Sequence, residues 1–232
     1  MRINLCNLAQ LEDTVRVLCP IIEQNIYLDN HLNEYLLRRE LVACILGSQV
    51  RYEMAYTALE RIERAGLLND EWWCNVEDNF ETKIFEVLSG KTHQNHDNWC
   101  YRFPKTRAHQ LATARNAIAK WPLSERLFKN TDPKNIRQRL VMDIAGIGPK
   151  QASMFLRNIG ISYDLAILDT HVLRFMKMQN IVCQEHMNIA TLPAYERTER
   201  VVKNYANSLG YPVGYLDWAI WATMRAAREL GL

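Results

Sequence analysis

Helical periodicity is the feature that most constrains the fold of this 232-residue chain. Apolar residues recur three or four positions apart in most segments, as Leu37, Leu41 and Ile45 do on the way to Gly47, and no segment alternates like a half-buried strand. We expect further helices before residue 66, over 106–120, from 133 through 144, over 201–209 and over 215–230. Residues 69–79 and 90–100 are polar and irregular, so we expect loops there. The sequence therefore predicts an all-α protein.

Composition narrows the class of protein further. Apolar residues make up 48% of the chain and charged residues 23%, which is ordinary for one sizeable core or for two smaller helical lobes that share a cleft. No uncharged apolar run is long enough for a membrane span, and the first residues lack the pattern of a secretory signal. We therefore expect no membrane association and a cytoplasmic or nucleoid-associated protein.

The six cysteines show no metal-binding spacing. They are scattered along the chain without a close pair, which excludes the usual zinc-ribbon and iron–sulfur patterns. Without a secretory signal, free thiols are a better interpretation than disulfides. We expect no metal ion from Cys6, Cys19, Cys44, Cys74, Cys100 and Cys183.

Charge is distributed unevenly along the chain. The net charge is only +2, but residues 98–124 carry several arginines and lysines and no acidic residue, whereas acidic residues gather over 70–81. One basic surface opposite an acidic one suits a protein that faces a polyanion. A solvated helix face would produce the same pattern, so charge alone leaves both interpretations open.

The segment Ile144-Ala145-Gly146-Ile147-Gly148-Pro149-Lys150 is the most informative in the chain. A helix ends near Gly146 and a second one begins around Gly148, with Pro149 suited to its first turn. Free backbone amides at such a helix start point toward an anion, as in the helix-hairpin-helix grip on a DNA phosphate. Glycine at a plain corner between two helices gives the same short pattern, and the flanking residues decide between the two.

Those flanking residues run through Ala152-Ser153 and Phe155-Leu156-Arg157-Asn158 and then through 166–175, which contains Asp169. Further segments follow the same order at 40–46 with 48–49, at 101–103, 107–108 and 114–115, and at 216–221. Together they resemble the helix-hairpin-helix DNA glycosylase superfamily. The run over 152–158 is most similar to the archaeal-type (type 2) 8-oxoguanine DNA glycosylase/AP lyases.

The resemblance implies a two-lobed helical bundle with a DNA-binding cleft between the lobes. One lobe would hold residues 30–125, and the other 1–29 plus 126–232. The implied protein is a monomer that flips 8-oxoguanine out of duplex DNA, excises it and cleaves the strand. Two alternatives stay open: the same lysine chemistry on a different modified base, and a non-catalytic DNA-binding module. The pairing of Lys150 with Asp169 favours an enzyme, because a phosphate clip needs neither.

The resemblance assigns the chemistry to Lys150 and Asp169. Lysine amines are normally protonated, but the first turn of a helix and partial burial both disfavour an ammonium ion. The free amine of Lys150 would attack C1′ and form a Schiff base, from which β-elimination breaks the strand. Asp169 would steady the positive charge as the glycosidic bond stretches. An Asp at this position is also a good N-cap, which is its plainer interpretation.

The remaining assignments concern DNA and the base. Gly146 and Gly148, with Gln49, Arg107 and His171, would contact DNA, Gln49 from the loop that fills the space left by the extruded base. Turn and core roles are the plainer interpretations of Gln49 and His171.

The last helix would bring Trp221, Trp218 and Asp217 to the base pocket, although aromatic residues on such a helix are more often core. Relatives tend to finish in a lysine-bearing tail, whereas this chain finishes in 228–232 without one. No cofactor is required, and a monovalent cation at the hairpin is a further expectation.

Overall fold

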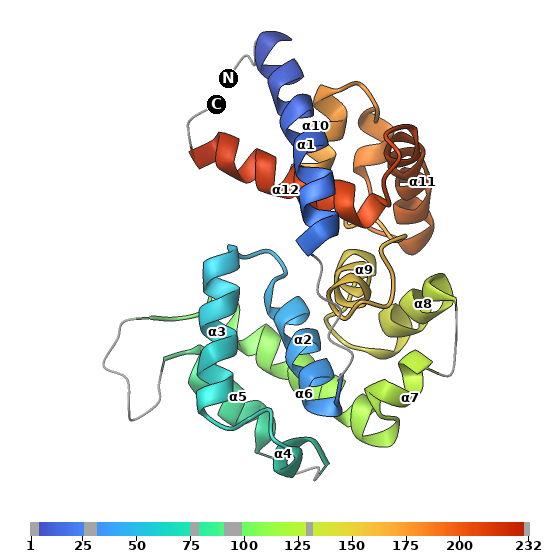
Figure 1. Cartoon of the computed structure of the whole chain (residues 1–232). Helices are drawn as coiled ribbons and strands as arrows, with labels where there is room; N and C mark the ends of the chain where they lie inside the picture. Colours follow the sequence, from blue (N-terminus) through green and yellow to red (C-terminus); the bar gives the residue numbers. More distant parts are fainter. Residues whose placement is uncertain (1–4, 26–31, 75–78, 91–98, 129–131, 230–232) are drawn as a thin grey trace. The chain divides into compact units, whose positions relative to one another are not determined.

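The computed structural model of the chain describes residues 5–25, 32–74, 79–90, 99–128 and 132–229. Within these ranges every regular element is a helix and none is a strand, so the predicted all-α class is confirmed (Figure 1). None of the described helices has the length and apolar character needed to cross a membrane. The side chain of Cys6 and much of the expected loop over 90–100 fall outside what the structure describes.

The chain divides into two compact units, which are described separately. The central unit is Asn30–Ile159, and the terminal unit combines Met1–Asp29 with Gly160–Leu232. The expected second lobe included residues 126–159, whereas in the structure this segment belongs to the central unit. The reason is local packing, because the buried Arg126 donates to the carbonyl oxygens of Ala117 and Trp121, at 2.9 Å each, and pairs with Asp143 at 2.7 Å.

The central unit is built around α2. This helix contacts α3, α6, α7 and α9, and most of its circumference is buried, including the fully enclosed Leu37, Leu41 and Ile45. Such a helix must be apolar on several faces, which fits its sequence. The unit comprises α2 (Glu34–Leu46), α3 (Tyr52–Arg64), α4 (Asp70–Cys74), α5 (Phe80–Leu88), α6 (Pro104–Lys120), α7 (Leu123–Phe128), α8 (Pro133–Asp143) and α9 (Pro149–Asn158).

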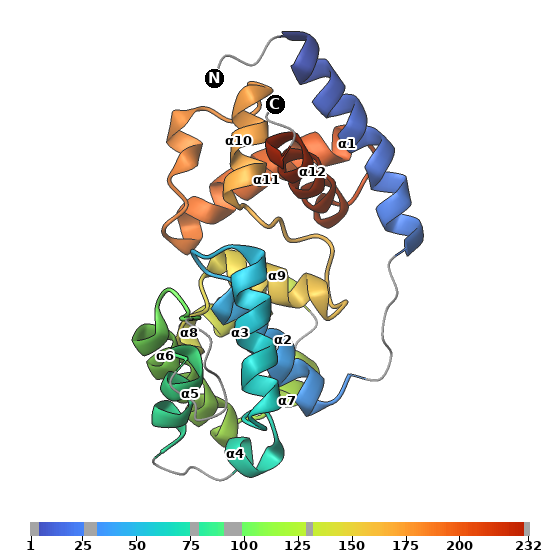
Figure 2. The same ribbon diagram turned by 90° about the vertical axis from the view of Figure 1, so that its left-hand side faces the viewer.

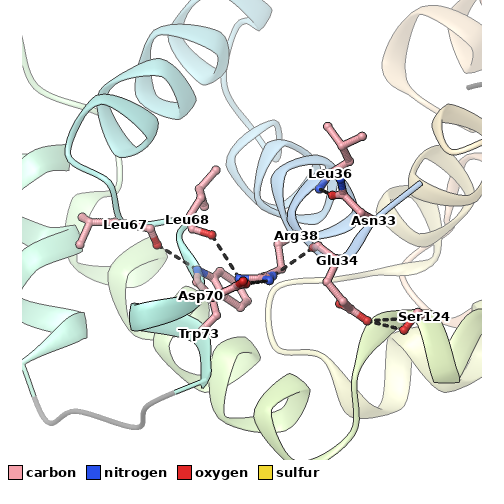
Figure 3. A network of polar contacts seen from close by, with 9 residues as sticks. All are labelled: Asn33, Glu34, Leu36, Arg38, Leu67, Leu68, Asp70, Trp73 and Ser124. Atoms are coloured by element: carbon pink, nitrogen blue, oxygen red, sulfur yellow. Dashed lines mark hydrogen bonds and ion pairs between the residues drawn. The ribbon is translucent and has the colours of Figure 1, made fainter. Parts of the chain in front are cut away.

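A buried arginine on α2 ties this helix to the turn before α4 (Figure 3). The Arg38 guanidinium donates to the carbonyl oxygens of Glu34 at 3.0 Å and Leu68 at 3.2 Å, and it pairs with Asp70. Its side chain is only 5% exposed, so these partners replace the water that a buried charge would otherwise lose. The network is structural and fixes α2 at one end of the unit.

Helix α4 lies within the segment 69–79 for which we expected a loop. Trp73 explains the difference, because its ring is 2% exposed and its Nε1 donates to the carbonyl oxygen of Leu67 at 2.9 Å (Figure 3). A buried indole with its N–H satisfied anchors a short helical turn against the core. The loop expectation is therefore wrong for residues 70–74, and residues 75–78 are not described.

In the terminal unit α1 (Leu5–Asn25) packs against α12 (Val213–Glu229), and the two helices cross (Figures 1 and 2). Its core is continuous from Val15 and Cys19 of α1 to Phe175 and Met176 of α10. The remaining elements are α10 (Thr170–Met178), the 3-10 turn η1 (Gln184–Met187) and α11 (Leu192–Ser208). Helix α11 thus begins well before residue 201, where the apolar pattern had placed its start.

Candidate active site

Helices α8 and α9 meet through the hairpin turn, residues 144–148. Ile147 anchors the turn with 5% of its surface exposed, and Gly146 adopts a φ of +84°, in the left-handed region that favours glycine. A Cβ at Gly146 would also lie 3.1 Å from the Gln110 side chain. Behind the turn, the buried Arg137 of α8 donates to the Ser153 hydroxyl of α9 at 3.2 Å. The backbone conformation therefore favours glycine at position 146, and a side chain there would also displace Gln110.

The start of α9 leaves its first amides free. Gly148 is the N-cap residue, with φ −97° and ψ 179°, and it supplies no side-chain hydrogen bond. Pro149 takes the first helical position and Lys150 the second, half-buried. The first-turn amides of a helix have no partner within the helix, so this end keeps donors for an anion together with the positive end of the helix dipole. The expected helix-hairpin-helix geometry is present.

Lys150 lies close enough to α2 for its charge to act on Cys44 of that helix. Asn158, at the far end of α9, donates to the Glu40 carboxylate at 2.7 Å, and the Cys44 thiol donates to the same oxygen at 3.5 Å. Burial raises the pKa of the Cys44 thiol well above its ordinary value, and the Lys150 charge opposes that rise. Burial likewise raises the pKa of Glu40, against the hydrogen bond from Asn158. Among the described residues, the Lys150 amine itself makes no ion pair or hydrogen bond.

Asp169 is the N-cap residue of α10. Its Oδ1 accepts a hydrogen bond from the Val172 amide at 2.8 Å, with an extended backbone at φ −89° and ψ 179°. The capping role expected from the sequence is confirmed. The side chain is half-buried and stands at the end of the irregular, buried segment 165–168.

Three buried polar side chains hold that segment in place. The backbone amides of residues 166, 167 and 168 donate to the Glu199 carboxylate at 2.9 Å, the Asp217 carboxylate at 2.7 Å and the Tyr195 hydroxyl at 3.0 Å. Each of the three side chains is at most 2% exposed. A non-helical backbone needs such partners when it is buried. The backbone leading to Asp169 is therefore fixed on three successive residues.

The three residues predicted for the base pocket lie on α12 in different surroundings. Asp217 is 1% exposed, and its carboxylate is bound to the amide of residue 167, which gives it a structural role. Trp218 is 40% exposed, so the core interpretation of this residue is wrong. Trp221 is half-buried, with the Arg225 guanidinium 5.3 Å from its ring centroid. A contact of any of the three with a base stays a prediction.

Gln49 and Arg107 belong to the central unit together with the hairpin turn and Lys150. Gln49 is exposed at the tip of the turn after α2, with a φ of +63° that is unusual for a residue other than glycine. Arg107 is only 6% exposed and is hydrogen-bonded inside the unit rather than presented to solvent. This burial does not favour the direct DNA contact that we expected of it.

His171 belongs to the terminal unit with Asp169, half-buried in the first turn of α10. A metal site finds no support in the part of the chain that is described, where no three His, Cys, Asp or Glu side chains are placed to share an ion. The monovalent cation expected at the hairpin turn stays a prediction.

Comparison with known proteins agrees with the resemblance that the sequence motifs indicate. The family model for 8-oxoguanine DNA glycosylase matches residues 22–211. A protein of Sulfurisphaera tokodaii named 8-oxoguanine DNA glycosylase/AP lyase is 31% identical over 194 residues, which cover 84% of each chain. The chain belongs to the 8-oxoguanine DNA glycosylase family. A relative of the same name from Metallosphaera sedula is 32% identical over 195 residues, again 84% of each chain.

Solved structures of 8-oxoguanine DNA glycosylases share the fold of this family member. The 8-oxoguanine DNA glycosylase of Thermotoga maritima superposes with a TM-score of 0.71 at 29% identity, covering 92% of this chain and 93% of that one. The Methanocaldococcus jannaschii 8-oxoguanine glycosylase/lyase, solved with a 15mer DNA containing 8-oxoguanine, gives a TM-score of 0.67 at 20% identity over 97% and 92%.

Proposed function

We propose that this chain is a bifunctional DNA glycosylase and AP lyase that excises 8-oxoguanine from duplex DNA. The observation that carries the proposal is the position of Lys150, one residue after the proline of an uncapped helix start, in a chain of the 8-oxoguanine DNA glycosylase family. The relatives named above carry both activities in their names, and one solved neighbour holds DNA containing 8-oxoguanine.

The reaction begins when Lys150 gives up a proton and its free amine attacks C1′ of the flipped nucleotide. A C1′–N bond to the lysine forms as the glycosidic bond breaks, and the base leaves with the bonding pair and takes up a proton. Opening of the sugar ring gives a Schiff base. Loss of a C2′ proton then expels the 3′ phosphate, which cleaves the strand by β-elimination. The Asp169 carboxylate, held by the Val172 amide, steadies the positive charge that develops on the sugar.

DNA binding uses the amides at the start of α9, because Gly148 supplies no cap there, whereas the Ile147 amide already donates to the Ile144 carbonyl oxygen at 3.3 Å. This helix start, beside Gly146 and Gly148, holds a backbone phosphate without reading sequence, and His171 holds a second one. Gln49 occupies the space left by the extruded nucleotide. Trp218 and Trp221, on the accessible side of α12, take the base by stacking. The proposed enzyme acts as a monomer, and its location is the cytoplasm or the nucleoid.

A panel of duplexes, each with one modified base, tests the proposed substrate. We expect the wild-type chain to excise 8-oxoguanine faster than guanine, uracil, thymine glycol or alkylated adenine, with strand cleavage in the same reaction. Excision of another lesion through Lys150 would keep the chemistry and replace the substrate. Tight duplex binding without cleavage of any member would leave only the non-catalytic module.

A further inference from the structure

In the turn after α2, residues 47–50, two backbone carbonyl oxygens accept hydrogen bonds from arginine side chains of another segment. We call this turn the wedge loop because it carries Gln49. The Arg107 guanidinium donates to the Ser48 carbonyl oxygen at 2.7 Å, and Arg102 donates to that of Gln49 at 3.1 Å. Just before the loop, the Tyr101 hydroxyl donates to the Leu46 carbonyl oxygen at 2.6 Å. One short segment, 101–107, thus supplies all three donors.

Arg107 also reaches the hairpin turn. Its second amino group donates to the Gln110 side chain at 2.6 Å, and Gln110 is the side chain that packs against Gly146. The arginine therefore joins the wedge loop to the hairpin turn through one intermediate residue. All these residues belong to the central unit, so the connection lies within one compact body.

We propose that Arg107 is a positioning residue. It holds the wedge loop so that Gln49 enters the duplex, and it fixes the position of that loop relative to the hairpin turn through Gln110. This inference rests on the proposed function, since it assigns a role in the same DNA-binding site. It replaces the direct DNA contact that the sequence had suggested for Arg107.

The alternative is a salt link from Arg107 to a DNA phosphate, and the structure argues against it. The side chain is 6% exposed and both terminal amino groups already have partners. A phosphate contact would require those bonds to be exchanged. The loop needs the restraint, because Gln49 adopts a left-handed φ of +63° that a residue with a Cβ seldom keeps on its own.

A double-mutant cycle in the full-length protein tests the proposal. The variants are Gln49→Ala, Arg107→Met, Arg107→Lys and each Arg107 change combined with Gln49→Ala. The duplex carries an uncleavable tetrahydrofuran site beside 2-aminopurine, whose fluorescence rises when neighbouring bases unstack. We expect each single variant to lower the fluorescence rise at saturating protein to a similar level, and the combined variants to lower it no further. Lysine should not rescue, because one ammonium group cannot reach both the Ser48 carbonyl and Gln110.

Arg115→Met is the matched control. Arg115 is a buried arginine on the same helix, 3% exposed, and it stacks over Phe80 rather than reaching the wedge loop. This variant should lose stability in thermal unfolding yet keep the full fluorescence rise. Equal losses in the Arg107 and Arg115 variants would reduce Arg107 to a fold-stabilising residue and overturn the proposal.

The salt dependence of duplex affinity separates positioning from a phosphate contact. Arg107→Met should leave the slope of log affinity against log salt unchanged, whereas loss of one phosphate contact makes it shallower by about 0.9. A shallower slope, rescue by lysine, or independent effects of Gln49 and Arg107 would each overturn the inference. A coupled pair in a protein that excises no 8-oxoguanine would keep the inference and overturn the proposed substrate.

Discussion

The helices that carry Lys150 and Asp169 begin in opposite ways. Helix α9 starts at Gly148, which has no side chain to cap it, so its first amides stay open to an anion. Helix α10 starts at Asp169, whose own carboxylate fills that position and binds the Val172 amide. The same positive helix end is thus left uncapped in one unit and holds a fixed negative charge in the other.

Helix α8 supplies an internal reference for both starts. It begins Asp132-Pro133-Lys134, and the Asp132 carboxylate accepts from the Lys134 amide at 3.0 Å. Helix α9 begins Gly148-Pro149-Lys150, so the two differ at the cap and share the proline and the lysine. A Pro-Lys start is therefore not the distinguishing feature of the candidate site. The distinguishing feature is the uncapped start of α9. Because α8 has the same Pro-Lys start with a cap, variants of α8 measure the effect of capping on stability separately from any effect on excision.

The largest difference is expected between the two capping aspartates. Asp169→Asn should slow single-turnover excision by roughly a hundredfold or more, because a neutral amide no longer stabilises the developing charge. Asn and Asp cap comparably, so the free energy of unfolding should change little. Asp132→Asn is the matched control and should leave both quantities nearly unchanged. Similar excision rates in the two variants would reduce Asp169 to a cap.

Closing the open cap should have an intermediate effect. Gly148→Asp gives α9 the cap that α8 has, and the nearest obstacle to its Cβ is the flexible end of Gln151 at 3.1 Å. We expect a gain of a few tenths of a kcal/mol in the free energy of unfolding. Duplex affinity should fall about tenfold or more, since a carboxylate takes the place of the phosphate.

Gly148→Asn separates charge from shape in that experiment. It caps as well as aspartate but carries no charge, so its affinity should fall less than that of Gly148→Asp in the same equilibrium binding titration. Equal affinities of both variants and the wild type would show that the start of α9 holds no phosphate.

The smallest expected effect concerns Glu40 of α2, whose carboxylate accepts a hydrogen bond from Asn158 of α9. Burial raises the pKa of Glu40 above its ordinary value of 4.5, so the folded state binds its proton more tightly than the unfolded state. The free energy of unfolding should therefore fall as pH rises from 4.5 through the raised pKa. Glu40→Gln keeps an oxygen for Asn158 and Cys44 and removes this titration. In urea unfolding, the free energy of unfolding of Glu40→Gln should exceed that of the wild type at pH values above the raised pKa. Below pH 4.5 the two proteins should have the same free energy of unfolding.

Sequence patterns predicted the starts of α8, α9 and α10 well, because each of these starts depends on adjacent residues. Asp169 as a cap, Gly146 at a left-handed turn and Pro149 in a first turn all follow from local geometry. The site residues on these starts could therefore be located without a structure. Their flanking motifs added the family, which single motifs of this length do not specify.

The residues that hold the site in place were harder to predict, because their hydrogen-bond partners are distant in the sequence. Tyr195 and Glu199 are buried polar residues on α11 that bind the backbone before Asp169, so the first half of that helix lacks an apolar stripe. The Thr191 cap before Pro193 was the available signal for its start. Arg107 resembles a surface cation in sequence, and only the fold shows that it holds the wedge loop.

Borohydride trapping with the two Pro-Lys helix starts tests the central claim most directly. Reducing agent is added while the protein cleaves an 8-oxoguanine duplex, and covalent protein–DNA adducts are counted for wild type, Lys150→Gln and Lys134→Gln. Because only an imine is trapped, we expect adducts from wild type and Lys134→Gln and none from Lys150→Gln, which should still fold and bind the duplex. A full adduct yield from Lys150→Gln would contradict the account and place the nucleophile elsewhere in the chain.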